Sequence, residues 1–175
     1  MKFKKFNFKK VKSTNDTAIR IIKNTDFKFG MVISDTQLSG KGQYGNKWIS
    51  YKGNLFVSFF HELKNINVSL STLTKINCLL VKKILAKYCK KKIIFKKPND
   101  LLIDKKKVCG ILQETIFYRN TKYAIIGIGI NVEKSPLLVN YPTTFINFFT
   151  KKKITSFKIF NEIKSNFEIF LDKQK

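Results

Sequence analysis

The stretch DTQLSGKGQYGNKWISYKGNLFVS, residues 35–58, holds four of the eight glycines in the chain. Residues 31–34 before it read as a short strand, and residues 54–60 at its end are aromatic and β-branched enough to form another. A glycine-rich run between two strands differs from the dinucleotide-binding fingerprint, in which a helix follows the glycines. Glycine here lets backbone N–H groups approach an anionic ligand closely, with Lys41 and Lys47 adding positive charge. A flexible hairpin loop explains the spacing equally well, so the stretch alone leaves both interpretations open.

Four further motifs, in a fixed order around this stretch, decide between the two interpretations. They are Ser13-Thr14-Asn15, Lys96-Lys97-Pro98-Asn99-Asp100, Lys107-Val108-Cys109-Gly110-Ile111-Leu112-Gln113-Glu114 and Gly127-Ile128-Gly129-Ile130-Asn131. Together with the glycine stretch they resemble the signature motifs of the biotin protein ligases. Each motif is weak alone, but five in the same order over residues 13–131 are specific and cover about the whole catalytic domain of that family. We expect a short form that lacks both the N-terminal helix-turn-helix and the C-terminal β-barrel domain of its relatives.

The length of 175 residues fits one domain with its own core and is too short for two ordinary ones. Hydrophobic residues at 43% and aromatic residues at 14% are typical of a folded globule. We expect no transmembrane helix, because no run of about eighteen uncharged apolar residues occurs, and no signal peptide, because lysines interrupt residues 1–15. Cys78, Cys89 and Cys109 lack metal-binding spacing, which predicts reduced thiols and a cytoplasmic location.

The formal net charge of +24 raises nucleic-acid binding as an alternative function. However, all of the 35 basic residues except Arg20 and Arg119 are lysines, and nucleic-acid readers usually exploit the planar guanidinium of arginine. The lysines are also spread along the chain instead of forming one arm. We therefore interpret the charge as mostly compositional, which makes nucleic-acid binding the less favoured function. The same charge suits recruitment of an acidic protein partner.

Apolar periodicity predicts three amphipathic helices, at residues 14–25, 71–89 and 156–172. Strands are predicted at residues 2–10, 30–36, 54–63, 93–95, 101–103, 108–118 and 122–132. Residues 104–106 read as a tight turn and residues 133–144 as a polar loop. The resemblance implies one α+β domain over residues 1–175, with a mixed, largely antiparallel sheet and helices mainly on one face. This is the biotin/lipoate ligase catalytic-domain type, which is similar to the class II aminoacyl-tRNA synthetases.

The resemblance also implies the reaction, its substrates and its partner. Biotin and ATP form biotinyl-5'-AMP with the help of Mg²⁺, and the biotinyl group then passes to a lysine of a biotin carboxyl carrier protein domain of a biotin-dependent carboxylase. The protein is expected to be a monomer or a weak homodimer. Carboxylate and phosphate are both anionic, so fixed ammonium groups, backbone N–H donors and the metal ion are needed to stabilise the charge that develops.

The resemblance assigns roles to particular residues. Lys107 is the catalytic residue, Asp100 contributes to the magnesium site, and Lys96 with its neighbour Lys97 assists with the phosphates. The biotin-binding residues are Ser13, Thr14, Gln37, Gly40, Lys41, Gly42, Gly110, Leu112, Gly127 and Gly129. The residues expected to bind ATP and the adenylate are Gln43, Asn46, Trp48, Asn99, Lys107 and Asn131.

Two of these assignments have a purely structural alternative. Ser13 or Thr14 also suits the N-cap of the first helix, which needs only one hydroxyl. Gly127 and Gly129 fall on one face of a strand at a period of two, which clears space for a flat group such as the rings of biotin. The alternative for the two glycines is a pair of β-bulges.

The chain departs from the family pattern at four positions and leaves three other functions open. Three arginines of the pattern are replaced by Lys41, Gln43 and Asn46, and a tryptophan is replaced by Lys97. The alternatives are a ligase of the same fold for lipoate or another acyl acid, a degenerate biotin-binding protein without catalysis, and a basic nucleic-acid-binding domain. The motifs at residues 107–114 and 127–131 favour biotin over lipoate.

Overall fold

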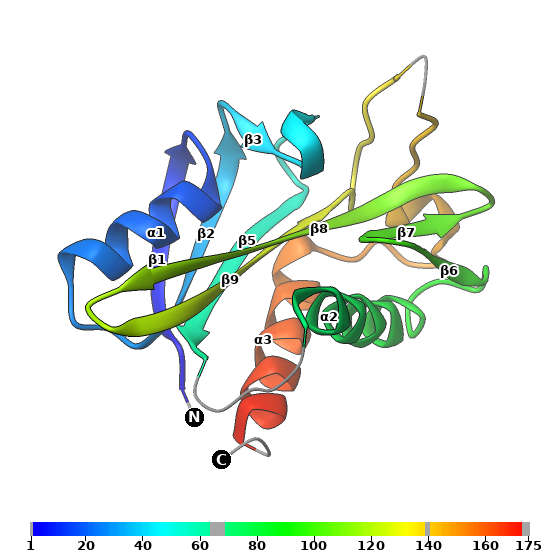
Figure 1. Cartoon of the computed structure of the whole chain (residues 1–175). Helices are drawn as coiled ribbons and strands as arrows, with labels where there is room; N and C mark the ends of the chain where they lie inside the picture. The colour runs from blue at the N-terminus through cyan, green and yellow to red at the C-terminus, as the bar shows by residue number, and fades with distance from the viewer. Residues whose placement is uncertain (1, 64–68, 139–140, 173–175) are drawn as a thin grey trace.

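Seven strands form one sheet within the residues that the computed structural model describes, which are 2–63, 69–138 and 141–172 (Figure 1). In spatial order the strands are β1 (Lys4–Val11), β2 (Phe29–Gln37), β5 (Leu55–Glu62), β9 (Thr121–Ile130), β8 (Lys106–Tyr118), β7 (Asp100–Ile103) and β6 (Ile93–Lys96). Only β1 and β2 pair in parallel, whereas every other neighbouring pair in this sheet is antiparallel. The sheet is therefore mixed and largely antiparallel, as predicted.

The first helix, α1 (Thr14–Asn24), covers one face of the sheet. It begins after Ser13, whose hydroxyl accepts a hydrogen bond from the backbone N–H of Asp16 and so acts as the N-cap. Its apolar side is buried in a cluster with residues of β2, β5 and β9; the cluster comprises Ala18, Ile22, Val32, Phe60, Tyr123 and Ile125. Burial of this apolar stripe holds the helix against the sheet.

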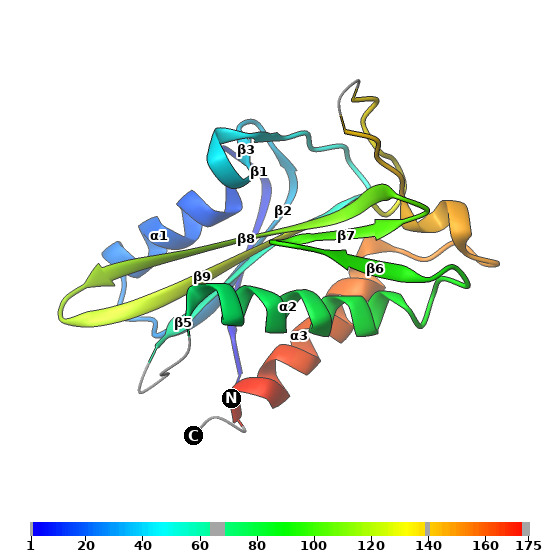
Figure 2. The ribbon, with the colours of Figure 1, turned by 45° about the vertical axis from the view of Figure 1, so that its right-hand side comes forward.

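The other two helices, α2 (Leu70–Leu85) and α3 (Ser156–Asp172), share the opposite face and the main core (Figure 2). Phe167 of α3 stacks on Phe59 of β5 with ring centroids 4.6 Å apart. Two of the three helices thus lie on one side, in agreement with the predicted arrangement. Of the helices in the described residues, none is long and apolar enough to cross a membrane.

Several predicted boundaries differ from the structure by a few residues; for example, the strands predicted at residues 2–10 and 122–132 are Lys4–Val11 and Thr121–Ile130. Two of the differences have a clear local cause. The helix predicted at residues 71–89 begins at Leu70 and ends at Leu85. Ser69 caps its start, and at its end the N–H groups of Lys87 and Tyr88 bond carbonyls only three residues back, which tightens the chain out of the α-helix. The turn predicted at 104–106 has two residues, both with positive φ, because Lys106 already pairs with Ile103.

The sheet register brings the glycine motifs together. In the β8–β9 hairpin Gly110 lies opposite Gly129, and Leu112 lies opposite Gly127. The glycine-rich stretch at residues 35–58 crosses near this point, where its Trp48 contacts Gly110 and Gly129. It contains a small sheet of β3 (Gly40–Lys41) and β4 (Lys47–Trp48), joined by the short 3₁₀-helix η1 (Gln43–Gly45). A second 3₁₀-helix, η2 (Ile146–Phe149), precedes α3.

Candidate active site

A cavity of about 590 Å³ lies between the glycine stretch, the start of α1 and strands β7, β8 and β9. It brings together nearly all of the residues that the sequence assigned to a site. Those that line it are Ser13, Thr14, Gln37, Lys41, Gly42, Gln43, Asn46, Trp48, Asn99, Asp100, Lys107, Gly110, Leu112, Gly127, Gly129 and Asn131, with Lys96 and Lys97. The exception is Gly40, which pairs with Trp48 in the β3–β4 sheet and does not line the cavity.

Thr14 and Gln37 form a hydrogen-bonded pair in the cavity wall. The side-chain oxygen of Gln37 accepts from the backbone N–H of Thr14 at 2.8 Å and from its hydroxyl at 3.0 Å. Ser13 caps α1 and Thr14 holds Gln37, so the two neighbouring hydroxyl residues carry out different tasks. The amide nitrogen of Gln37, with only a 3.4 Å contact to Ser50, lies in the same wall.

Behind this pair is a buried polar network that the sequence analysis missed. The hydroxyl of Ser58, on the fully buried strand β5, lies 2.8 Å from the hydroxyl of Thr14 and 2.5 Å from the side-chain oxygen of Asn15. Asn15 in turn donates to Glu114 at 2.6 Å. The available signal was a single hydroxyl within an apolar strand, because buried polar groups normally have hydrogen-bonding partners.

The three motif glycines leave room for side chains of the protein itself. A Cβ atom on Gly129 would lie 2.5 Å from the indole ring of Trp48, and one on Gly110 would lie 2.8 Å from the same ring. Gly127 leaves room in the same way for Asn15. The sequence predicted space for a flat group on this face, and in this structure the flat group over Gly110 and Gly129 is Trp48.

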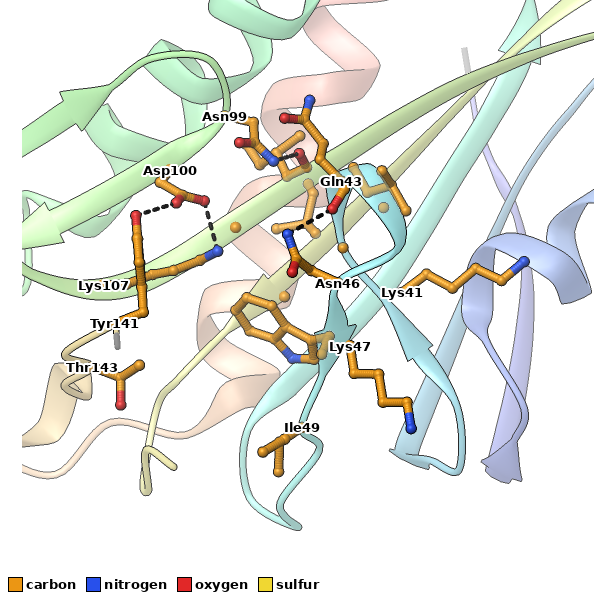
Figure 3. Close-up of a pocket in the computed structure, with 18 of the residues that line it drawn as sticks. Lys41, Gln43, Asn46, Lys47, Ile49, Asn99, Asp100, Lys107, Tyr141 and Thr143 are labelled. Carbon is orange, nitrogen blue, oxygen red and sulfur yellow. Dashed lines mark hydrogen bonds and ion pairs between the residues drawn. The ribbon is translucent and has the colours of Figure 1, made fainter. Parts of the chain in front are cut away.

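A charged cluster occupies the part of the cavity near β7 and the start of β8 (Figure 3). Lys107 Nζ lies 2.8 Å from Asp100 Oδ1, and the hydroxyl of Tyr141 donates to Asp100 Oδ2 at 2.6 Å. Lys96 Nζ donates to the oxygen of Tyr141 at 3.1 Å. Burial and, secondarily, the hydrogen bond to the Asp100 carboxylate raise the pKa of Tyr141, so its hydroxyl stays protonated and acts as a donor.

The two asparagines expected to bind ATP and the adenylate, Asn99 and Asn131, are both buried. Asn99 donates to the carbonyl of Ile111 at 2.8 Å, and Asn131 donates to the carbonyl of Thr144 at 3.1 Å. Asn131 is only 2% exposed, and its side-chain oxygen has no hydrogen-bonding partner within the described residues. Such an unpaired acceptor in a cavity wall suits a donor group on a ligand.

Lys41 and Lys47 of the glycine stretch point away from the charged cluster (Figure 3). Lys41 forms an ion pair with Asp16 in the first turn of α1 at 2.6 Å. The hydrogen bond to Asp16 is the main reason that the pKa of Lys41 is raised. Gln43 and Asn46, which replace arginines of the family pattern, bond to each other locally, because the side chain of Asn46 donates to the carbonyl of Gln43 at 2.9 Å.

The cavity offers little for a metal held by the protein alone. No group of three or more His, Cys, Asp or Glu side chains occurs in the part of the chain that the structure describes. Both oxygens of Asp100 already have a partner, because Oδ1 forms an ion pair with Lys107 and Oδ2 accepts a hydrogen bond from Tyr141. Mg²⁺ is often held by one or two carboxylates together with substrate phosphates. The donor set therefore fits an ion that arrives with a nucleotide better than a resident one.

Tyr141 was also missed by the sequence analysis. It lies in the segment predicted as a polar loop at 133–144, of which residues 139–140 lie outside the described residues. No motif marks Tyr141, and the available signal was that it is the one aromatic residue in the sequence of this loop. Its place in the site depends on how that loop returns to β8, which local sequence does not encode.

Comparison with known proteins identifies the family. Residues 8–131 match the biotin/lipoate A/B protein ligase family. The chain belongs to this family. Biotin–protein ligase 2 of Arabidopsis thaliana is 34% identical over 126 residues, which cover 68% of this chain and 36% of that protein. The bifunctional ligase/repressor BirA of Escherichia coli (strain K12) is 32% identical over 102 residues, which cover 57% of this chain and 32% of BirA. The chain thus spans about a third of the length of these curated relatives.

Solved structures of the biotin/lipoate A/B protein ligase family show the same fold. The biotin protein ligase from Aquifex aeolicus in complex with biotin and ATP has a TM-score of 0.80 and 28% identity, and covers 97% of this chain and 71% of that chain. A lipoate protein ligase from Thermoplasma acidophilum has a TM-score of 0.66 with 11% identity, covering 98% of this chain and 84% of that chain, which shows likeness of fold alone. The predicted fold class and the resemblance to biotin protein ligases are confirmed.

Proposed function

We propose that this protein activates biotin with ATP to give biotinyl-5'-AMP and then transfers the biotinyl group to a lysine of a biotin carboxyl carrier protein domain. The observation that carries the proposal is that one cavity holds both the Thr14–Gln37 pair and the Lys107–Asp100 pair. The first pair offers polar groups to a ureido ring, and the second offers an ammonium to anionic reactants. The Aquifex aeolicus relative, which was solved with biotin and ATP, supports this choice of substrates.

In the first step a biotin carboxylate oxygen attacks the α-phosphorus of ATP. The bond between that phosphorus and the bridging oxygen breaks, and pyrophosphate leaves. Lys107 is the residue proposed to act here, because its ammonium lines the cavity and its side chain is only 21% exposed. A fixed positive charge in such a site lowers the barrier by stabilising the phosphate oxygens as their charge develops. Asp100 holds that ammonium in place at 2.8 Å.

In the second step the uncharged ε-amine of an acceptor lysine attacks the acyl carbon of the mixed anhydride. An amide forms, the bond from the acyl carbon to the phosphate oxygen breaks, AMP leaves with the electron pair, and the attacking nitrogen loses one proton to water. The net charge of +24 favours the approach of an acidic acceptor domain and increases the rate of encounter. Asp100 would be the candidate protein ligand for Mg²⁺ bound together with the ATP phosphates, whose negative charge the ion would partly neutralise.

Biotin is favoured over lipoate by the chemistry of the cavity wall. Thr14, Asn15 and Gln37 present hydroxyl and amide groups there. The ureido group of biotin has donors and an acceptor to pair with them, whereas the dithiolane ring of lipoate offers no N–H or carbonyl group for such hydrogen bonds. Relatives named as biotin–protein ligases at 33–34% identity agree with this choice.

Release of pyrophosphate is the test that separates the candidate functions. The protein would be incubated with ATP, Mg²⁺ and either biotin or lipoate, and then with labelled biotin and a carrier domain. We expect pyrophosphate with biotin only, and label on the carrier domain. Pyrophosphate release with lipoate would indicate a lipoate ligase of the same fold, whereas biotin binding without pyrophosphate release would indicate a non-catalytic binding protein.

A location in the cytoplasm is also proposed, because the free cysteines Cys78, Cys89 and Cys109 are all buried as thiols.

A further inference from the structure

The segment at residues 141–144 lies directly beside the start of β8. The backbone N–H of Lys107 donates to the carbonyl of Pro142 at 2.8 Å, and the N–H of Thr144 donates to the carbonyl of Lys107 at 2.9 Å. Lys107 and Thr143 form a parallel bridge. Strand β9 ends at Ile130, which pairs with Cys109, so this segment takes the neighbouring place beside Lys107 where β9 is no longer present. The backbone of Lys107 is therefore held by the segment that carries Tyr141.

The side chain of Tyr141 links three charged groups (Figure 3). Its oxygen accepts from Lys96 Nζ at 3.1 Å, and its hydroxyl donates to Asp100 Oδ2 at 2.6 Å. The other carboxylate oxygen of Asp100 lies 2.8 Å from Lys107 Nζ. The ring of Tyr141 also lies beneath both ammonium groups, with its centroid 4.6 Å from Lys96 Nζ and 5.3 Å from Lys107 Nζ.

We propose that Tyr141 is a positioning residue for adenylation, acting on Lys107 through Asp100. A lysine side chain has four rotatable bonds and carries a point charge, so its ammonium takes up a fixed position only when its surroundings define one. Asp100 supplies that position, and Asp100 is itself fixed because each of its oxygens has a different partner. Removal of the Tyr141 hydroxyl leaves the Asp100 carboxylate, whose side chain is 12% exposed, with one partner and freedom to turn.

This inference rests on the proposed function, because it assigns Lys107 to the adenylation step. It makes a specific kinetic prediction. Tyr141 does not contact Thr14 or Gln37, whose hydrogen bonds are made to each other and to Ser58 and Ser50. Loss of its hydroxyl should therefore change the rate of the chemical step and leave biotin binding nearly unaltered.

The test is Tyr141→Phe, which keeps the ring beneath both ammonium groups and removes only the hydroxyl. In biotin-dependent exchange of pyrophosphate into ATP we expect kcat to fall by roughly 10- to 100-fold, because small displacements of a catalytic group have effects of this size. The KM for biotin should change less than about threefold, since ground-state contacts are retained. Tyr118→Phe is the matched control: it also removes a hydrogen-bonded tyrosine hydroxyl, which donates to the carbonyl of Lys23 at 2.7 Å near the far end of the β8–β9 hairpin.

A double-mutant cycle decides whether Tyr141 acts through Lys107. If it does, Lys107→Met with Tyr141→Phe will be as slow as Lys107→Met alone, within about twofold. The inference would be overturned if the double variant lost activity by the product of the two single-variant losses in kcat, or if the kcat of Tyr141→Phe equalled that of Tyr118→Phe.

Crystal structures of the unmodified and Tyr141→Phe proteins give a readout that does not need activity. We expect the Asp100–Lys107 contact to open in the variant, and its retention would also overturn the inference. An unmodified protein without exchange activity would refute the proposed function, while the crystallographic comparison would still test the network.

Discussion

The hydroxyl of Ser58 lies 2.8 Å from the hydroxyl of Thr14, and Ser58 is fully buried on β5. The same oxygen lies 2.5 Å from Asn15 Oδ1. A serine hydroxyl has one proton, so Ser58 donates to only one of these two oxygens at a time. The hydroxyl of Thr14 contacts both Ser58 and Gln37, so Ser58 on β5 helps to set its orientation.

Replacement of Ser58 by Ala should reduce both stability and affinity for biotin. The change leaves Asn15 and Thr14 short of a partner in a buried site, which costs about 1–3 kcal/mol of unfolding free energy. A freely turning Thr14 hydroxyl should also raise the Kd for biotin, by about tenfold for each 1.4 kcal/mol lost. Urea unfolding and calorimetric titration with biotin measure the two effects.

Ser34→Ala is the matched control for this prediction. Ser34 is also a buried serine, and it donates to the carbonyl of Thr36 at 2.8 Å, but it does not line the cavity. Its replacement should lower stability without changing the Kd for biotin. Equal affinities of the Ser58→Ala and unmodified proteins would show that β5 does not orient Thr14.

Lys107→Met should slow adenylation by roughly 100- to 1,000-fold, the usual effect of removing one preorganised charge or donor. Methionine keeps most of the length of the side chain, so packing against Trp48 and Tyr141 should survive. The neighbouring Lys106 is exposed and pairs only through its backbone with Ile103, so Lys106→Met is the control and should keep its activity. Pyrophosphate exchange measures both, and a reversed order of the two effects would place the catalytic lysine at 106.

Most of the residues that the motifs assigned to one candidate site line one cavity, and those on strands meet because their strands pair in the sheet. Gly110, Gly127 and Gly129 lie on two paired strands, and Asp100 pairs with Gly110 across β7 and β8. Alternating apolar residues were enough to define those strands and the hairpin turn between them. The pairing of these strands therefore places residues that are far apart in the sequence next to one another.

The sequence could not predict the contacts that depend on tertiary packing. Ser58 looks like any serine in a strand until α1 is placed against β5, which brings Asn15 to it. Tyr141 lacks a motif, and its contact with Asp100 arises because the loop after β9 returns beside Lys107. Likewise, Gly127 and Gly129 were expected to leave space for a flat group, but the ring that lies over Gly129 in this structure belongs to Trp48, from a different part of the chain.

The single histidine of the chain gives a pH dependence of stability with a defined sign. Burial lowers the pKa of His61, and its hydrogen bond to the backbone of Glu62 only partly offsets this. The unfolded chain therefore takes up a proton near its usual pKa of 6.5, at a pH where the native protein does not. Unfolding free energy should fall as the pH drops below about 6.5, by at most about 1.4 kcal/mol per pH unit.

Urea unfolding between pH 7.5 and 5.5 measures this slope. In His61→Gln the side chain does not titrate, so the unfolding free energy should change less over the same range. The same slope in both proteins would mean that His61 is protonated in the native state as readily as in the unfolded chain.

Gly129→Ala should displace Trp48 from the cavity wall. The new methyl group would lie 2.5 Å from the indole, so the ring has to move away from Gly110 and Gly129. Because the chain has one tryptophan, its fluorescence reports this ring alone. We expect emission at longer wavelength and stronger quenching by iodide, together with weaker binding of biotin.

Ile126→Val, a core change elsewhere on β9, is the control for a general loss of core packing. It should lower the free energy of unfolding by about 0.5–1.5 kcal/mol and leave the emission unchanged. Unchanged emission in Gly129→Ala would show that the ring of Trp48 does not lie against Gly110 and Gly129 in solution.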